Sequence, residues 1–176
     1  MRFVETKVDG AFLVESEPVA DERGFFARVF CREEFAANGL NPDLAQGNVS
    51  WNHAKGTLRG MHYQAAPHQE AKLVRCTRGA IWDVALDLRP DSPTYLAWAG
   101  HELSDDNRSM LYIPEGCAHG FLTLTDGAEV TYQMSAPYAP AAARGVRWND
   151  PAFGIDWPGE VVVINQRDAG YPDTEP

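Results

Sequence analysis

The chain has 176 residues, 44% of them hydrophobic and 11% aromatic, which fits a single globular domain over residues 1–176 with a sizeable core. Its 25 acidic and 15 basic residues leave a formal net charge of -10, which argues against nonspecific binding to nucleic acid or to an anionic membrane. No apolar run approaches the roughly 20 residues that span a bilayer, and the N-terminal residues lack the apolar core of a signal peptide, so we expect a cytoplasmic protein.

The first part of the chain predicts short strands and one helix. Residues 11–15 predict a strand, and a polar turn from Pro18 to Gly24 precedes a second strand over residues 25–30. Residues 33–39 predict a short helix, because Glu33 and Glu34 occupy its first turn and Gly39 is suited to its C-cap.

From Gln46 onward the pattern is one of strands. Short segments rich in Val, Ile, Leu, Tyr and Trp alternate with Gly, Pro, Asp and Asn, and they predict strands near residues 46–50, 57–64, 71–77, 80–88, 95–103, 109–113, 120–125 and 128–135. Many strands at roughly ten-residue spacing, with little helix between them, indicate an antiparallel sandwich or barrel of jelly-roll type. The polar tail after Trp157-Pro158 is expected to pack around the outside.

The segment Gly56-Thr57-Leu58-Arg59-Gly60-Met61-His62-Tyr63-Gln64 carries charged and titratable side chains in a strand pattern. His62 taken alone is open to three interpretations: a proton-transfer residue, a metal ligand or a buried structural histidine. Arg59 and His62 have opposite parity along the strand. Both reach one pocket only through a bulge at Gly60 or if Arg59 enters from the rim.

Alternation also assigns faces on two neighbouring strands. One face of residues 81–88 is apolar, formed by Trp82, Val84, Leu86 and Leu88. Asp83 and Asp87 on the opposite face must therefore meet water, a polar cavity or a partner. Lys72 shares a face with Val74 and Cys76, so we expect Lys72 to point into the barrel.

Ile113-Pro114-Glu115-Gly116-Cys117-Ala118-His119-Gly120-Phe121 contains Pro-x-Gly-x-x-His, a tight turn that delivers His119 into the next strand. It resembles the second conserved motif of the cupin barrels. In a metal cupin this histidine joins a His-x-His pair and a Glu, whereas the corresponding region here offers His62, His68 and Glu70 without that pair. His68 follows Pro67 and is expected in a loop, so we predict no metal site.

Seven motifs occur in one order and carry a more specific resemblance: Asp21-Glu22-Arg23-Gly24-Phe25-Phe26, Leu58 to Gln64, Lys72-Leu73-Val74-Arg75, Asp83 to Arg89, Ser92-Pro93-Thr94, Ile113 to Phe121 and Trp148-Asn149-Asp150-Pro151. Together they resemble the dTDP-4-dehydrorhamnose 3,5-epimerase family from about residue 10 to 168. The resemblance implies an all-β, cupin-type antiparallel jelly-roll barrel with a few short peripheral helices, usually a homodimer. It also implies a role in deoxysugar biosynthesis, as in the dTDP-rhamnose pathway. The implied reaction inverts C3 and C5 of a 4-keto-6-deoxyhexose that is attached to a nucleoside diphosphate. This reaction requires neither a metal nor a redox cofactor.

The resemblance implies roles for individual residues. His62 matches the family's base, and Asp168 matches the carboxylate that orients this base. Lys72 matches the residue that stabilises the charge of the enolate, and Tyr132 matches the acid on the opposite face. Positions that bind the diphosphate or sugar, or support the base, are matched by Arg23, Gln46, Asn48, Arg59 and His119; aromatic positions near the substrate are matched by Phe26 and Tyr138. Asp83 matches an active-site carboxylate, and a purely structural hydrogen-bonding role for it stays equally open.

Alternatives remain at this point. On local pattern alone Tyr132 is also a barrel-wall aromatic, Asp168 a solvated charge and Arg23 an exposed turn residue. Two departures from the family pattern, Pro137 before Tyr138 and Arg144 in place of a common Glu, lie near the sugar and nucleotide contacts. A C3-only epimerase and a non-catalytic cupin that binds a sugar nucleotide are the rival functions, and Arg23 and Phe26 are candidates to act across a dimer interface.

Overall fold

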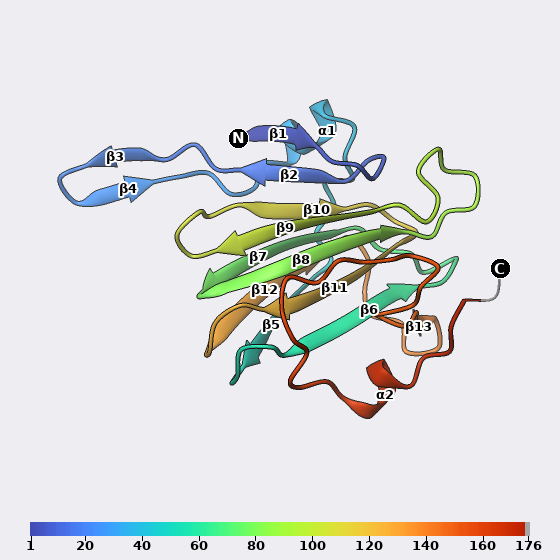
Figure 1. Ribbon diagram of the computed structural model, residues 1–176. Helices are drawn as coiled ribbons and strands as arrows, with labels where there is room; N and C mark the ends of the chain where they lie inside the picture. Colours follow the sequence, from blue (N-terminus) through green and yellow to red (C-terminus); the bar gives the residue numbers. More distant parts are fainter. Residues whose placement is uncertain (175–176) are drawn as a thin grey trace.

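The computed structural model describes residues 1–174, and two antiparallel sheets form its centre (Figure 1). One sheet has the order β1 (Arg2–Glu5), β2 (Phe12–Glu15), β10 (Met110–Ile113), β7 (Lys72–Arg78), β12 (Ala128–Met134), β5 (Gln46–Asn52). The other has the order β13 (Ala143–Gly145), β6 (Leu58–Gln64), β11 (Cys117–Thr123), β8 (Ala80–Asp87), β9 (Trp98–Ser104). This arrangement confirms the predicted all-β, cupin-type antiparallel barrel.

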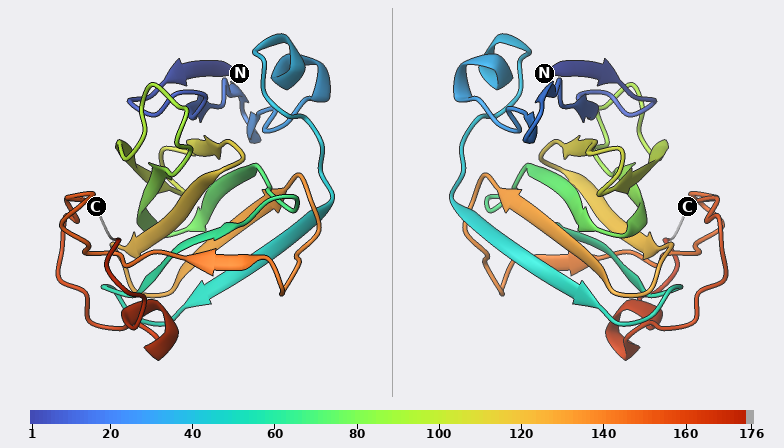
Figure 2. Two further views of the ribbon diagram at one scale, coloured as in Figure 1. Left: turned by 90° about the vertical axis from the view of Figure 1, so that its right-hand side faces the viewer. Right: turned by 90° about the vertical axis from the view of Figure 1, so that its left-hand side faces the viewer.

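Three short elements lie outside these sheets. A two-stranded hairpin of β3 (Val19–Asp21) and β4 (Gly24–Phe26) projects from the body (Figure 1), and helices α1 (Arg32–Ala37) and α2 (Gln166–Ala169) lie at opposite ends of the molecule (Figure 2). Gly39 follows α1 with φ +74°, the left-handed conformation expected just beyond a helix C-terminus. Within residues 1–174, neither helix has the length and apolar character required to cross a membrane.

The eight strands predicted between residues 46 and 135 all coincide with observed strands, and the largest shifts, three residues, fall at the starts of β9 and β11. The predicted strand over residues 25–30 is wrong beyond Phe26, because β4 pairs only with the three-residue β3. The alternation pattern missed β1, β3, β13 and α2, each only three or four residues long.

The core lies between the two sheets and is built from alternate residues of their strands. Val74 and Cys76 on β7 are fully buried in it, as the shared face with Lys72 predicted. The opposing sheet contributes Ile81, Ala85 and Phe121 to the same cluster. Lys72 therefore continues an inward-facing row at the point where the barrel opens.

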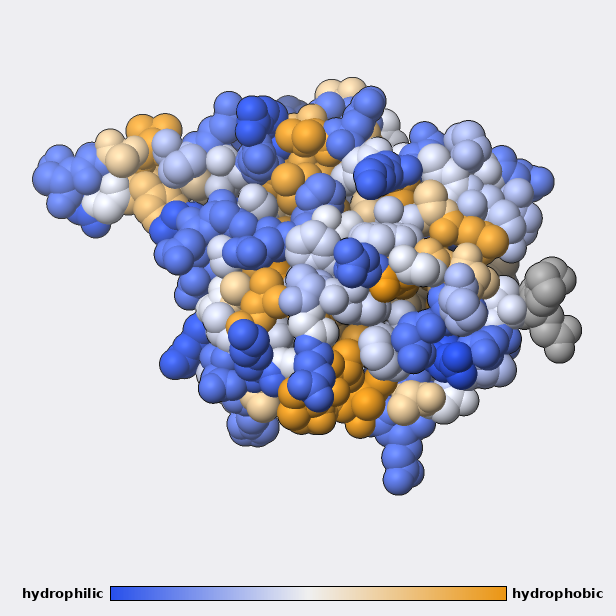
Figure 3. Space-filling view, in the orientation of Figure 1, coloured by the Kyte–Doolittle hydropathy of each residue, from blue (hydrophilic) through white to orange (hydrophobic). Residues whose placement is uncertain are grey.

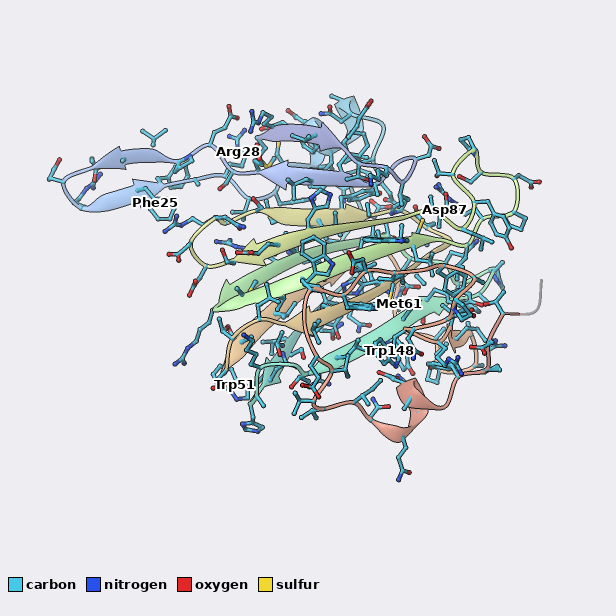
Figure 4. All side chains as sticks on the ribbon, in the orientation of Figure 1. Phe25, Arg28, Trp51, Met61, Asp87 and Trp148 are labelled. Carbon is cyan, nitrogen blue, oxygen red and sulfur yellow. The ribbon has the colours of Figure 1, made fainter. Side chains whose placement is uncertain are left out.

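Strand β8 is buried on both faces. Its apolar residues Val84 and Leu86 belong to a second cluster with Phe153 and with Trp157, because the segment after β13 covers the outside of this sheet. The face that carries Asp83 and Asp87 is consequently the inner one. Asp87 lies at the end of β8 (Figure 4), where the side chains of Arg89, Ser92 and Thr94 donate to its carboxylate.

Candidate functional site

A cavity of about 550 Å³ opens between the two sheets and brings together most of the predicted site residues. Its lining includes Gln46, Asn48, Arg59, His62, Lys72, His119, Tyr132, Tyr138 and Asp168. A second cavity, of about 780 Å³, lies among β1, the end of α1 and the turn before β11, and other residues line it.

A β-bulge in β6 places Arg59 and His62 on the same side. His62 pairs with His119 and Arg59 with Phe121, so three steps on β6 face two steps on β11. One extra residue in β6 reverses the alternation between the two side chains. Gly60 sits in the bulge with φ +129°, and a Cβ there would lie 2.5 Å from Gly120 Cα. Of the two alternatives that the sequence left open, a bulge at Gly60 or entry of Arg59 from the rim, the structure shows the bulge.

His62 is paired with a carboxylate from the far end of the chain. Nε2 of His62 lies 2.8 Å from Oδ1 of Asp168, and the Gly60 N–H donates to Oδ2 of Asp168 over 3.1 Å. Asp168 is 0% exposed. Burial alone would raise the pKa of Asp168, but the hydrogen bonds from His62, Gly60 and Arg167 hold this pKa below its usual range. The carboxylate that faces His62 is therefore ionised at neutral pH.

The tail of the chain supplies this carboxylate. Asn165 caps α2 by accepting the Asp168 N–H over 2.7 Å, which fixes the backbone of the short helix. The isolated bridge between Thr57 and Val163 holds the preceding segment beside β6. The tail thus packs on the outside, as expected, and also closes the cavity with three of its residues, Asn165, Arg167 and Asp168.

Arg167 is a site residue that the sequence reasoning missed. Its Nη2 lies 3.0 Å from Nε2 of His62, and its Nε lies 3.3 Å from Oδ1 of Asp168. A guanidinium only donates, so Nε2 either accepts from Arg167 or, when protonated, donates to Asp168, but not both. The position of Arg167 directly before Asp168 was the one sequence feature that could have indicated its place in the site.

Lys72 and Tyr132 occupy the sheet opposite His62. Lys72 is 7% exposed, and its Nζ lies 3.1 Å from the His62 carbonyl oxygen and 3.1 Å from Oε1 of Glu70. Burial raises the pKa of the Tyr132 hydroxyl, and nearby Arg59 partly opposes the rise, so this hydroxyl is protonated at neutral pH. A histidine on β6 and a tyrosine on β12 thus face one cavity from its two walls.

The cavity has more cationic than anionic side chains, unlike the whole chain. Its cations are Arg59, Lys72, Arg144 and Arg167, and its acids are Glu70 and Asp168. Arg59 is held by Oδ1 of Asn52, which accepts from its Nε over 2.8 Å. Because charges more than a Debye length apart, about 8 Å, are screened, the local surplus decides which ligands are attracted.

Three predicted residues lie outside this lining. Asp83 is buried behind His119 and lies 2.8 Å from its Nε2, which makes it an orienting group for that ring. Arg23 pairs with Asp21 on the projecting hairpin, and Phe26 is 77% exposed there. In a single chain the hairpin holds both residues away from the cavity that the other predicted residues line.

Within residues 1–174, no three His, Cys, Asp or Glu side chains are grouped so that they could hold a metal ion. Glu70, one of the three residues weighed for such a site, is instead paired with Lys72.

Comparisons with known proteins agree with the geometry. Residues 5–175 match the sequence profile of dTDP-4-dehydrorhamnose 3,5-epimerase. The Methanothermobacter thermautotrophicus protein of that name is 46% identical over 173 residues, covering 97% of this chain and 92% of its own. The dTDP-4-dehydrorhamnose 3-epimerase of Streptomyces niveus is 40% identical, covering 96% of this chain and 81% of its own.

Solved structures give the same answer. The crystal structure of the Bacillus anthracis dTDP-4-dehydrorhamnose 3,5-epimerase, with TDP and PPi bound, aligns with a TM-score of 0.93 at 37% identity and covers 98% of this chain and 99% of its own. From sequence and fold together, the chain belongs to the dTDP-4-dehydrorhamnose 3,5-epimerase family and is an isomerase of the epimerase type.

Proposed function

We propose that this protein inverts C3 and C5 of a dTDP-4-keto-6-deoxyhexose in deoxysugar biosynthesis of the dTDP-rhamnose type. The observation that carries the proposal is the placement of His62 and Tyr132 on opposite walls of one cavity, with Lys72 beside them. Inversion at carbon requires a proton to leave from one face and to return to the other. A base and an acid on two different sheets meet that requirement.

The chemistry follows from the ketone of the substrate. The C4 carbonyl acidifies the C–H bonds at C3 and C5, so His62 accepts a proton and the bonding electrons move into an enolate. Lys72 stabilises the charge on the enolate oxygen, because its ammonium is a preorganised donor. Tyr132 then donates its hydroxyl proton to the carbon from the opposite face, and solvent restores both side chains before the second carbon reacts.

Asp168 makes His62 a suitable base. When Nε2–H of His62 donates to Oδ1 of Asp168, Nδ1 keeps its lone pair and accepts the proton. The ionised carboxylate then stabilises the imidazolium that forms.

The cationic lining favours a nucleoside diphosphate as the anionic part of the substrate. Arg59 and Arg167 present guanidinium groups, which bind phosphate oxygens in a bidentate geometry. Gln46, Asn48 and Tyr138 line the same cavity and offer polar and aromatic contacts for the sugar or base.

We infer that a second copy of the chain completes the site. The hairpin that carries Arg23 projects from the body (Figure 3), and Phe25 lies on it (Figure 4). Val19, Phe25 and Phe26 of this hairpin are all exposed. Exposed apolar side chains on such an arm favour burial against another surface. Strand β5 is an edge strand that borders the cavity, and its side chains Val49 and Trp51 are exposed. On the second copy, these side chains would form the surface against which the hairpin packs.

The closest competing function is epimerisation at C3 alone. The similarity to the Streptomyces niveus 3-epimerase keeps this reading open, since the same base and acid serve both reactions. Incubation with a dTDP-4-keto-6-deoxyhexose in deuterium oxide separates the two. Deuterium at both C3 and C5 is the expected result, label at C3 alone would establish the mono-epimerase, and no label would contradict both and favour a binding protein.

A further inference from the structure

We propose that Glu70 is a positioning residue for the reaction, which holds the Lys72 ammonium in place and keeps it charged inside the cavity. This inference rests on the proposed function, in which Lys72 stabilises an enolate. Oε1 of Glu70 lies 3.1 Å from Nζ of Lys72, and within residues 1–174 Lys72 is the only side-chain partner of Glu70. The pair is almost fully buried, with Glu70 6% and Lys72 7% exposed.

The geometry of the ammonium group supports this role. An ammonium carries three N–H donors. The contacts to Glu70 and to the His62 carbonyl oxygen, each 3.1 Å long, use two of them. One N–H of Lys72 is left for a ligand in the cavity that both residues line. Fixing two donors orients the third, which is the preorganisation that stabilisation of a developing oxyanion needs.

Glu70 is itself fixed by the fold. It stands two residues before Lys72, in the segment that leads into β7, and the two side chains meet at the cavity that both line. Ala71 between them is anchored on Ser135, whose hydroxyl accepts the Ala71 N–H over 2.8 Å and whose own N–H donates back to Ala71 over 2.9 Å. Oε2 of Glu70 is buried without a hydrogen-bond partner among the described residues. The carboxylate is therefore a buried charge whose one described counter-charge is Lys72.

Electrostatics shows why a cation in this position needs a carboxylate. Burial lowers the pKa of Lys72, and the charge and hydrogen bond of Glu70 oppose that fall. The other titratable or charged groups near Lys72 come from several strands. Arg59 and His62 on β6, His119 on β11 and Tyr132 on β12 line the cavity, and Asp83 on β8 and Cys117 on β11 lie near Lys72 outside that lining. Asp83 also raises the pKa of Lys72, but without a direct contact, whereas Glu70 lies 3.1 Å from its Nζ.

The test compares Glu70→Gln with a matched control, Glu115→Gln. Glu115 is a partly buried carboxylate at the second cavity, where it accepts from Asn41. We expect E70Q to lower kcat about 10- to 100-fold with little change in KM, and to move the alkaline limb of the kcat–pH profile to lower pH. E115Q should match the wild type. In a K72M background, E70Q should cost nothing further, because Glu70 acts through Lys72.

A second measurement does not depend on turnover. The chain has three lysines, Lys7, Lys55 and Lys72, and the first two are exposed, so 13C-labelled lysine gives three signals that substitution assigns. The titration midpoint of the Lys72 signal should fall in E70Q and stay unchanged in E115Q. An unchanged midpoint, or equal losses from E70Q with and without Lys72, would overturn the inference. Absence of deuterium exchange in the wild type would instead refute the proposed function.

Discussion

His62 and Asp168 are 106 residues apart in the chain, yet Nε2 of the histidine and Oδ1 of the carboxylate lie 2.8 Å from each other in the cavity. The contact joins β6 to α2, so the proposed base and the carboxylate paired with it come from the barrel wall and from the tail. The same carboxylate binds the bulge of β6 through the Gly60 N–H. The orientation of the His62 ring and the geometry of the strand are thus coupled through one side chain.

Replacing the base should separate binding from turnover. His62→Asn keeps a polar side chain but cannot accept the proton at carbon, so kcat should fall by about 10²- to 10⁴-fold. Nucleotide binding, measured by calorimetry with dTDP, should be largely preserved. His53→Asn, at an exposed histidine beyond the end of β5, is the control. Turnover retained in H62N would refute the base assignment.

Removing the acid should leave the first half of the reaction intact. Tyr132→Phe retains the ring but lacks the hydroxyl proton, and net epimerisation should slow by about 10²- to 10⁴-fold. Because His62 still removes and returns a proton on its own face, deuterium should enter the substrate without inversion. NMR of the recovered sugar distinguishes the two results. Exposed Tyr95→Phe should behave as wild type, and normal inversion in Y132F would exclude Tyr132 as the acid.

Asp168 should make stability depend on pH. Its pKa is lower in the folded protein than the reference of about 3.9, so its charge stabilises the fold above that value, and this contribution disappears as pH falls through the lowered folded pKa. Asp168→Asn should lower the free energy of unfolding by about 1–3 kcal/mol at pH 7, with the difference shrinking under acid. Urea titrations across pH measure this, with exposed Asp91→Asn as the reference. A difference independent of pH would contradict the linkage.

Gly60 should tolerate no side chain. In Gly60→Ala the new Cβ would meet Gly120 Cα at 2.5 Å and the His119 carbonyl oxygen at 2.9 Å, in addition to the strain of φ +129°. Gly24 has nearly the same φ, +130°, but open surroundings. Urea unfolding should show a loss of about 1–3 kcal/mol more for G60A than for G24A. Equal losses would mean that backbone strain alone, rather than close packing of β6 on β11, requires the glycine.

Exchange between subunits tests the contribution of the hairpin. Arg23→Ala and His62→Asn should each lack activity alone, whereas mixed dimers contain one complete site if Arg23 acts on the partner's cavity. Random reassociation makes half of the dimers mixed, so about a quarter of wild-type activity should return. Mixing R23A with an R23A/H62N double variant is the control, since no complete site forms. Failure of the first mixture to exceed this control would place Arg23 within its own subunit's site.

Alternation along the strands was sufficient to predict most of the barrel and the inward direction of Lys72. It also showed that Arg59 and His62 have opposite parity, so that either a bulge at Gly60 or entry of Arg59 from the rim was needed to bring them together. The register of β6 and β11 shows that a bulge is present. These features are local, because each depends on the period of one or two strands.

The features that escaped prediction depend on distant parts of the chain. A four-residue helix such as α2 carries no measurable periodicity, so Arg167 could be placed beside His62 only once the path of the tail was known. Glu70 was considered as a metal ligand because its type and position were visible, whereas its pairing with Lys72 depends on burial. Likewise, the family resemblance implies that Arg23 and Phe26 bind the substrate, but it does not distinguish the cavity of their own chain from that of a partner chain.

The two walls of the cavity belong to different sheets, and the side chains packed between those sheets set the spacing of the walls. In the proposed mechanism, the gap that a sugar ring must bridge between base and acid is therefore governed by the interior of the barrel rather than by its loops. Loops and the hairpin are free to diverge and to change which nucleotide or sugar is accepted. The configuration of the product would therefore be conserved as long as the packing of the core is conserved.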